Sequence, residues 1–334
     1  MAKAKWEGLV RRRDFITLIG GAAVSWPRMA WAQRSTTPVI GFLGFGTAAA
    51  SANRVEALRE GLRELGYVEG KNITIEFRWA ETADALRKGA AELVGMNVDV
   101  IFGTSSTEVE AARQVTKAIP IVFATHADPV GTGHVSSLPH PGGNITGLSV
   151  MQSDLTAKAL AILKEAVPQA ARFGVFWNPT VPSGRPTLQS AETTGAKLGV
   201  RIYPMQVRVR ADFDGAFATM ARERVDGFFV AASTLTRVER VPLAELALKH
   251  RLPSMFGTRE NVEAGGLMSY APDQIDLTRR AAIYIDKILK GEKSGSLPVE
   301  QASKYRLAIN LKTAKLLGLH LPPTLLALAD DLID

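Results

Sequence analysis

The chain has 334 residues, of which 46% are hydrophobic and 22% are charged, and it contains no cysteine. This length allows two domains with cores of their own, while the lack of cysteine excludes disulfides, thiolate nucleophiles and cysteine-ligated metals. The formal net charge is +7, but residues 1–32 hold six basic and two acidic residues, a net of +4, which leaves about +3 for the remainder. Such a small excess, without a basic cluster interleaved with aromatic residues, excludes a nucleic-acid partner.

The first 32 residues have the pattern of an export signal. Residues 11–16 (RRRDFI) place an arginine pair just before a Phe-Ile step, an apolar stretch covers 15–24, and residues 30–32 (AWA) have the small-x-small pattern that signal peptidase accepts. This pattern resembles a twin-arginine signal and predicts cleavage after Ala32 and a periplasmic mature protein. A membrane anchor is the alternative, but the apolar stretch is too short and is interrupted by Pro27 and Arg28.

Strand and helix signals then alternate along the chain. Period-two or continuous apolar runs predict strands, whereas apolar residues at helical spacing predict the helices between them. Strict alternation of this kind implies a parallel sheet with helices on both faces. We expect strands near 38–43, 73–78, 98–102, 120–125, 145–150, 172–177, 200–206, 226–231, 253–257 and 305–310, and helices near 53–65, 82–94, 106–117, 153–166, 273–290 and 312–317.

The second half of this pattern repeats the first at an offset of about 130 residues, the size of one α/β domain. The predicted fold is therefore α/β, with two similar doubly wound parallel-sheet lobes and one ligand-binding cleft between them. Four pairs of segments carry the repeat: 38–43 with 172–177, 73–77 with 202–205, 98–102 with 225–229, and 119–125 with 252–258.

The lobes are expected to be built from discontinuous segments. Residues 36–147 and about 268–295 would form the N-terminal lobe, residues 148–267 and about 300–320 the C-terminal lobe, and 321–334 a C-terminal tail. Two or three crossings between lobes would form a hinge that lets a monomer close around its ligand.

The candidate ligand-binding residues lie in loops that follow predicted strands. In parallel α/β sheets, ligands bind at the carboxyl ends of the strands, where helix N-termini offer unpaired N–H groups. Hydroxyl groups there can receive a ligand carboxylate, although they can also serve only as helix caps. The loop residues that we single out on this basis are Gly44, Thr47, Thr104, Ser105, Ser106, Asn178, Ser233 and Thr234.

Three further candidates carry other chemistry. Asp128 follows the 120–125 strand and could hold a ligand ammonium group, with His126 as a hydrogen-bonding neighbour, or it could simply begin a turn before Pro129. Tyr270 lies just beyond the Gly265-Gly266 break. As a hypothesis, Thr104–Ser106 hold the anionic end of the ligand and Asp128 the cationic end.

Signals for an enzyme are weak in the sequence. There is no dinucleotide fingerprint, no Walker-type Gly-Lys-Ser/Thr and no Gly-x-Ser-x-Gly elbow, and the histidines have no metal-ligand spacing. We therefore expect a binding protein without cofactor or metal. Two alternatives remain open: a periplasmic enzyme that is exported folded, and a ligand-sensing lobe that serves a signalling partner.

Several motifs resemble those of bacterial ABC-transporter substrate-binding proteins of the tryptophan/tyrosine-type uptake family. The resemblance implies a type I periplasmic-binding fold and delivery of an amino acid or related small solute, possibly aromatic, to an ABC permease at the inner membrane. In this chain, Thr104–Glu108 and His126 depart from the family pattern within the expected pocket, so the resemblance does not name the ligand. The motifs are 65–72 (LGYVEGKN), 76–81 (EFRWAE), 119–123 (IPIVF), 128–131 (DPVG), 141–147 (PGGNITG), 263–270 (EAGGLMSY), 288–292 (ILKGE) and 309–314 (INLKTA).

Overall fold

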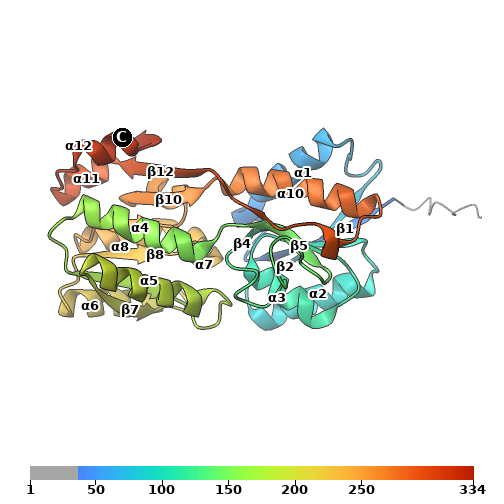
Figure 1. Cartoon of the computed structure of the whole chain (residues 1–334), viewed down its shortest axis with the longest axis horizontal. Coiled ribbons are helices and arrows are strands. Elements are labelled where there is room, and N and C mark those ends of the chain that lie inside the picture. Colours follow the sequence, from blue (N-terminus) through green and yellow to red (C-terminus); the bar gives the residue numbers. More distant parts are fainter. Residues whose placement is uncertain (1–36) are drawn as a thin grey trace, which may run out of the picture. The chain divides into compact units, whose positions relative to one another are not determined.

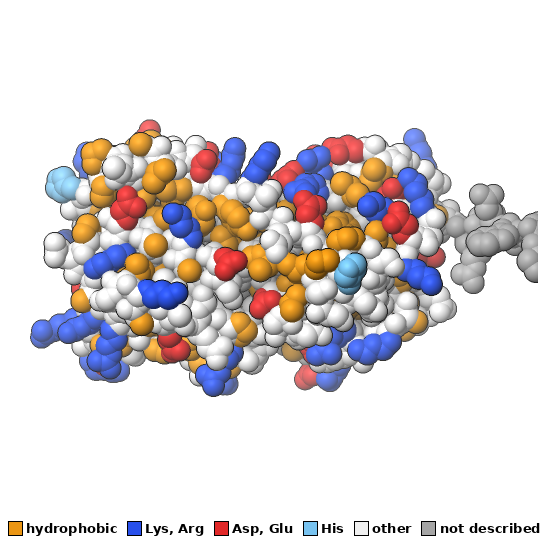
Figure 2. Space-filling view, in the orientation of Figure 1, with side chains coloured by type: hydrophobic (Ala, Val, Ile, Leu, Met, Phe, Trp, Pro, Cys, Tyr) orange, Lys and Arg blue, Asp and Glu red, His pale blue; other side chains and the backbone are white. Residues whose placement is uncertain are grey.

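A computed structural model describes residues 37–334, which form two α/β lobes (Figure 1). The expected export signal, residues 1–32, lies outside the described residues. Within residues 37–334, none of the helices is long and apolar enough to cross a bilayer. On the face shown in Figure 2, basic and acidic side chains are mixed over both lobes.

The first lobe is built on a six-stranded sheet whose paired strands are all parallel, in the order β11-β5-β4-β3-β1-β2. Alternate residues of β1 face opposite sides: Phe42 packs with helices α1 and α10, and Leu43 packs with α2 and α3. The elements are β1 (Val39–Phe45), η1 (Ala49–Ser51), α1 (Ala52–Glu64), β2 (Thr74–Ala80), α2 (Ala83–Gly95), β3 (Val100–Gly103), α3 (Ser106–Val115), β4 (Ile121–His126), β5 (Ile145–Ser149), α10 (Gln274–Leu289), η2 (Ser294–Ser296) and β11 (Glu300–Gln301).

The second lobe has a seven-stranded sheet in the order β13-β12-β10-β9-β8-β6-β7, parallel except for the β10–β12 pair. Its two faces again carry separate apolar clusters. The elements are α4 (Gln152–Ala166), β6 (Arg172–Trp177), α5 (Gly184–Leu198), β7 (Arg201–Gln206), α6 (Asp212–Arg222), β8 (Gly227–Val230), α7 (Thr234–Val238), α8 (Arg240–Lys249), β9 (Ser254–Phe256), α9 (Arg259–Glu263), β10 (Met268–Pro272), β12 (Tyr305–Asn310), α11 (Leu311–Leu317), α12 (Pro323–Leu328) and β13 (Asp331–Ile333).

The strand orders confirm the predicted fold class of two similar doubly wound lobes. Read from one edge, β2-β1-β3-β4-β5 of the first sheet has the same order as β7-β6-β8-β9-β10 of the second. The internal repeat seen in the sequence is therefore a repeat of topology. All these strands within one sheet point the same way, so the loops that follow them gather at one edge of each sheet.

The segment boundaries of the lobes differ from those expected. Residues 268–272 form β10 in the second sheet, where β10 pairs with β9 as β5 pairs with β4 in the first sheet. Residues 148–149 belong to β5 of the first sheet. Residues 300–301 pair with β5 as β11. Residues 321–334 are not a tail, because β13 pairs with β12 and Leu325 is buried in the second core. Three segments connect the lobes, after β5, β10 and β11.

Helices α1 and α10 lie side by side on one face of the first sheet (Figure 1). Gly61 lets them approach closely, because a Cβ at this position would lie 2.1 Å from the carbonyl oxygen of Arg279 and 2.9 Å from the Cβ of Ala282. The contact matters for the cleft, since α1 carries Arg54 and α10 begins with Gln274.

We expect Gly61→Ala to destabilise the protein by about 1–3 kcal/mol, because the added methyl group overpacks the α1–α10 contact. Gly215 in α6 is the matched control, since a Cβ there meets no atom within 4 Å. Gly215→Ala should instead stabilise the protein by about 0.5–1 kcal/mol through its helix propensity. Urea denaturation of both variants measures the difference, and equal stability of Gly61→Ala and wild type would show that the helices are not in close contact.

Candidate functional site

A cavity of about 350 Å³ lies between the two lobes. Its walls come mainly from loops at the carboxyl ends of strands in both sheets, as expected for paired doubly wound lobes. The first lobe contributes residues after β1 to β5, together with Arg54 of α1 and Gln274 of α10. The second lobe contributes residues after β6 to β9 and Arg237 of α7. Among the residues predicted from the sequence, Thr104, Ser105, Ser106, Asn178, Ser233 and Thr234 line this cavity.

The loop after β3 is organised around the buried carboxylate of Glu108, which is 1% exposed. Thr104 Oγ1 donates to Glu108 Oε1 at 3.1 Å, the backbone N–H of Ser105 donates to Oε2 at 3.0 Å, and the Ser105 hydroxyl also donates to Oε2. Ser105 is thus the N-cap of α3 in a capping box. These two hydroxyls already donate to Glu108, so neither has a proton left to donate to a ligand carboxylate. The hypothesis that they hold the ligand's anionic end stays a prediction, and these contacts do not support it.

Ser106 differs from its neighbours because its hydroxyl contacts His126 instead of Glu108. Its Oγ lies 3.3 Å from His126 Nδ1 and accepts the backbone N–H of Ala127 at 3.1 Å. His126 Nε2 lies 2.6 Å from His134 Nδ1, and His134 Nε2 lies 2.8 Å from Glu110 Oε2. Burial lowers the pKa of His126 well below its ordinary value, with a further decrease from His134, and burial also lowers the pKa of His134. His126 therefore lies behind the cavity wall, not on it.

Asp128 also lies away from the cavity wall. Its Oδ1 accepts the backbone N–H of Gly131 at 2.7 Å, and its carbonyl accepts the hydroxyl of Thr132 at 2.7 Å. The residue thus shapes a turn before and after Pro129, which is the alternative reading of the Asp-Pro step. The side chain that was expected to meet a ligand ammonium group is hydrogen-bonded to the backbone of its own turn.

The other three predicted residues have structural roles outside the cavity lining. A Cβ at Gly44 would lie 2.1 Å from the Trp79 ring, so the glycine admits that ring. Thr47 Oγ1 accepts the backbone N–H of Ala50. Tyr270 stacks on Tyr305, with ring centroids 5.8 Å apart. Both tyrosines lie on the paired strands β10 and β12 beside segments that connect the lobes.

Arg54 is the central residue that the sequence interpretation missed. It is 4% exposed, its Nη2 donates to Gln274 Oε1 at 2.7 Å, and its Nη2 lies 3.8 Å from Glu260 Oε1 of the second lobe. Among the described residues, its Nη1 has no hydrogen-bond partner. Burial lowers the pKa of Arg54, opposed by the charges of Glu260 and Glu108. The sequence did contain a signal for the burial of Arg54, because this residue lies four positions before Leu58 and seven before Gly61, on the buried face of α1.

A second buried arginine reaches the same cavity from the other lobe. Arg237 is 8% exposed, and its Nη1 donates to the carbonyl oxygen of Ala50 in the first lobe. Burial, together with the nearby charge of Arg54, lowers the pKa of Arg237 to about 10. Two guanidinium groups, one from each lobe, therefore make the cavity electrostatically suited to an anion.

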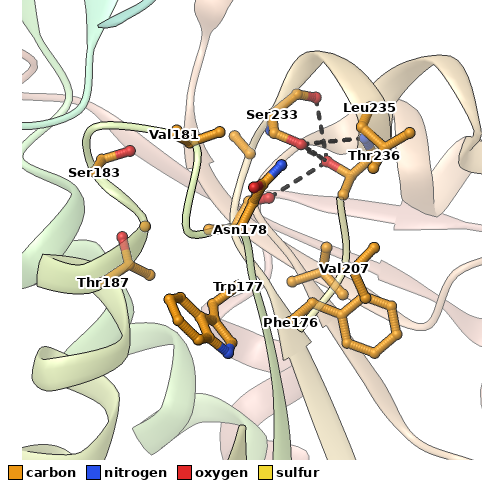
Figure 3. A pocket seen from close by; sticks show the side chains of 14 residues that line it. Phe176, Trp177, Asn178, Val181, Ser183, Thr187, Val207, Ser233, Leu235 and Thr236 are labelled. Carbon is orange, nitrogen blue, oxygen red and sulfur yellow. Dashed lines mark hydrogen bonds between the residues drawn. The ribbon is translucent and has the colours of Figure 1, made fainter. Parts of the chain in front are cut away.

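A smaller apolar pocket of about 50 Å³ adjoins this cavity in the second lobe (Figure 3). The rings of Phe176 and Trp177 and the side chain of Val207 line it. Asn178, Val181 and Leu235 line both spaces, so the two adjoin each other. At its rim, Ser233 accepts the N–H of Thr236 at 3.2 Å and caps α7, and Asn178 Oδ1 accepts from Thr180.

Fold and site together define a two-lobed α/β binding protein with a cavity between its lobes that two arginines line. The chain belongs to the ABC transporter substrate binding protein family, whose model matches residues 45–333. This is a family of binding proteins and not of enzymes. A tyrosine-binding protein of Clostridioides difficile is 26% identical over 260 residues, which cover 78% of this chain and 74% of the relative.

Two solved structures are similar to this chain. Each match covers 89% of this chain and 100% of the other. A conserved domain protein of Vibrio cholerae has 28% identity and a TM-score of 0.84. A domain of Streptococcus pneumonia solved in complex with L-Trp has 24% identity and a TM-score of 0.82. A leucine-binding protein of Thermotoga maritima shares the fold at 15% identity, with a TM-score of 0.59. The expected type I periplasmic-binding fold is thereby confirmed.

The two buried histidines predict that the protein loses stability as the pH falls below about 6.5, the ordinary pKa of histidine. Because both rings have lowered pKa values in the folded protein, the unfolded chain binds more protons in this range. The free energy of unfolding should therefore fall by up to about 1.4 kcal/mol per pH unit for each histidine.

Urea denaturation at pH 7.5 and 5.5 measures this loss. His126→Phe should reduce the pH dependence, and the same substitution at the exposed His140 is the control. If His126→Phe loses as much stability on acidification as wild type, His126 does not enter the folded state neutral.

Proposed function

We propose that this protein is the exported receptor of an ABC importer, and that it binds an amino acid with an apolar, aromatic side chain between its lobes. The observation that carries the proposal is the buried Arg54, which lines the interlobe cavity and keeps one guanidinium nitrogen without a partner among the described residues. The volume of the cavity, about 350 Å³, suits a ligand of this size.

A ligand carboxylate would satisfy the free N–H groups of Arg54. Leaving a buried charged donor unpaired costs about 1–3 kcal/mol or more, whereas a guanidinium and a carboxylate form short, charge-assisted hydrogen bonds. Arg237 adds a second positive charge from the opposite lobe. A carboxylate between the two arginines would hold both lobes and would favour the closed arrangement by its differential contacts. Arg54 and Arg237 thus replace Thr104 and Ser105 as the proposed anionic-end contacts.

The apolar pocket of Phe176, Trp177 and Val207 supports an apolar ligand side chain. It adjoins the larger cavity, so one molecule could place its charged groups in that cavity and its side chain toward the two rings. An aromatic ligand side chain could make offset or edge-to-face contacts with these two rings, which are the arrangements that aromatic pairs prefer. The relatives are a tyrosine-binding protein and a domain in complex with L-Trp, and they favour an aromatic amino acid here.

Export and delivery complete the proposal. The arginine pair, apolar stretch and Ala-Trp-Ala pattern in residues 11–32 support secretion to the periplasm. Membership of the substrate-binding family supports release of the ligand to a membrane permease. A pull-down from membranes with the purified protein in the presence of ligand tests that partner; recovery of a signalling protein in place of a permease would favour a sensing role.

We expect tyrosine, phenylalanine or tryptophan to raise the thermal unfolding midpoint of the purified protein in a screen that includes all amino acids, nucleosides and sugars. A ligand at one hundred times its dissociation constant adds about 2.7 kcal/mol of stability. Arg54→Met should weaken binding by about 30-fold or more, since a desolvated charge pair is worth about 2 kcal/mol or more.

Arg59→Met is the matched control for this experiment. Arg59 lies on the same helix, is half-exposed and pairs with Glu69 outside the cavity, so its loss should leave the affinity unchanged. Without ligand, Arg54→Met should be less stable than wild type, because it leaves Gln274 and Glu260 without their partner, so its affinity is measured at a temperature at which the variant is fully folded. Ligand affinity of Arg54→Met within twofold of wild type would refute the carboxylate site.

A further inference from the structure

Four side chains form a continuous hydrogen-bonded row from the cavity wall toward the surface of the first lobe. Ser106 lines the cavity, His126 and His134 are almost fully buried behind it, and Glu110 is partly exposed at the far end. The three contacts measure 3.3, 2.6 and 2.8 Å in that order. Neither helix capping nor the carboxylate site of Arg54 accounts for this row.

The backbone fixes the direction of the row. The N–H of Asp128 donates to Nδ1 of His126 at 3.2 Å, so this nitrogen is an acceptor and carries no proton. A neutral ring then has its proton on Nε2, which donates to Nδ1 of His134. His134 in turn has its proton on Nε2 and donates to Glu110. An ionised carboxylate only accepts hydrogen bonds, so Glu110 requires the same direction from its own end.

The protonation of these groups fits that direction. Burial lowers the pKa of both rings, which keeps each neutral with a single proton. Partial burial raises the pKa of Glu110, but hydrogen bonds from Arg113, His134 and Gln114 outweigh this effect, and its pKa is lowered overall. Arg113 and Lys117 also disfavour a second proton on His134. The row therefore holds one stable pattern of hydrogen bonds.

This pattern of hydrogen bonds determines how the hydroxyl of Ser106 can interact with a ligand. A serine hydroxyl has one proton and two acceptor lone pairs. Because Nδ1 of His126 carries no proton, Ser106 can only donate in the 3.3 Å contact, where it shares the nitrogen's lone pair with the N–H of Asp128. One lone pair of the hydroxyl accepts the N–H of Ala127 at 3.1 Å. One lone pair remains, on the side chain of a residue that lines the cavity. Toward a ligand, Ser106 is thus an acceptor only.

We infer that Ser106 is a specificity-determining residue that accepts a hydrogen bond from the ligand's ammonium group, and that His126, His134 and Glu110 are positioning residues that keep its proton away from the cavity. This inference rests on the proposed function, since it assigns the cationic end of an amino acid whose carboxylate is held by Arg54. It gives to Ser106 the role that the sequence suggested for Asp128. A ligand without the amine leaves this acceptor unpaired, and such a ligand is discriminated against.

The test compares amino acids with their deaminated analogues by titration calorimetry at pH 7.5. The pairs are L-tryptophan with indole-3-propionate and L-tyrosine with 3-(4-hydroxyphenyl)propionate. Wild type should prefer each amino acid by about 10- to 100-fold, the range for a hydrogen bond to a charged group. Ser106→Ala should reduce this preference at least fivefold, mainly by weaker binding of the amino acid.

His126→Phe separates positioning from a general structural role. Phenylalanine keeps an aromatic ring beside Phe123, whose ring centroid lies 4.9 Å from that of His126, but it offers no acceptor to Ser106. The serine proton can then turn into the cavity, so the amino acid should bind more weakly and the deaminated acid more tightly. The control His140→Phe, at an exposed position outside the cavity, should change neither affinity.

Each outcome bears on one of the two proposals. If wild type binds neither member of any pair, the proposed function fails. If wild type binds both members equally, or His126→Phe weakens both in the same proportion, the assignment of Ser106 is wrong and the receptor function stands. Should His126→Phe fail to fold, Ser106→Thr replaces it, because threonine retains the hydroxyl and should retain the preference that Ser106→Ala loses.

Discussion

The burial of the Arg54 guanidinium at the junction of the lobes is the constraint on which the site depends. A charge with 4% exposure needs partners, and its two partners come from distant parts of the chain: Gln274 begins α10, and Glu260 lies on α9 of the other lobe. Gln274 reaches Arg54 only because α10 returns to the first lobe and packs against α1 at Gly61. The discontinuous construction of the lobe and the placement of the charge are thus one feature.

The parallel sheets explain why a cavity arises there. Both sheets present the carboxyl ends of their strands to the same space, so short loops from nine strands can supply its walls without long insertions. Most polar groups in these loops stabilise the loops themselves, as the contacts of Glu108, Asp128 and Ser233 show. The groups left for a ligand are few, and they are the ones whose neighbours leave a donor or an acceptor unused.

The sequence predicted the fold more completely than the site, for a physical reason. Periodicity and the repeat reflect which residues of each strand and helix are buried, and this pattern is local, so the order of the elements could be predicted. The short strands β11 and β13 could not be predicted, because they depend on pairing with other parts of the chain. The loop positions were found, including Ser106 and Asn178. The orientation of side chains was not, because it depends on contacts such as that between His126 and His134, which lie eight residues apart but meet only in the folded loop. Arg54 was missed because its partners Gln274 and Glu260 are distant in the sequence and meet it only in the folded protein.

Under the proposed function, the two lobes divide the recognition of one ligand. The first lobe supplies Arg54 and Ser106, which suit the carboxylate and the ammonium group of an amino acid. The second supplies Arg237 and the apolar pocket of Phe176 and Trp177. The carboxylate between Arg54 and Arg237 is common to all amino acids, whereas only an amino acid with an apolar side chain also fills the pocket of the second lobe. Because a ligand shifts the lobes toward closure only by the contacts it makes in the closed state, the side chain, not the charged ends, should decide which amino acids close the protein.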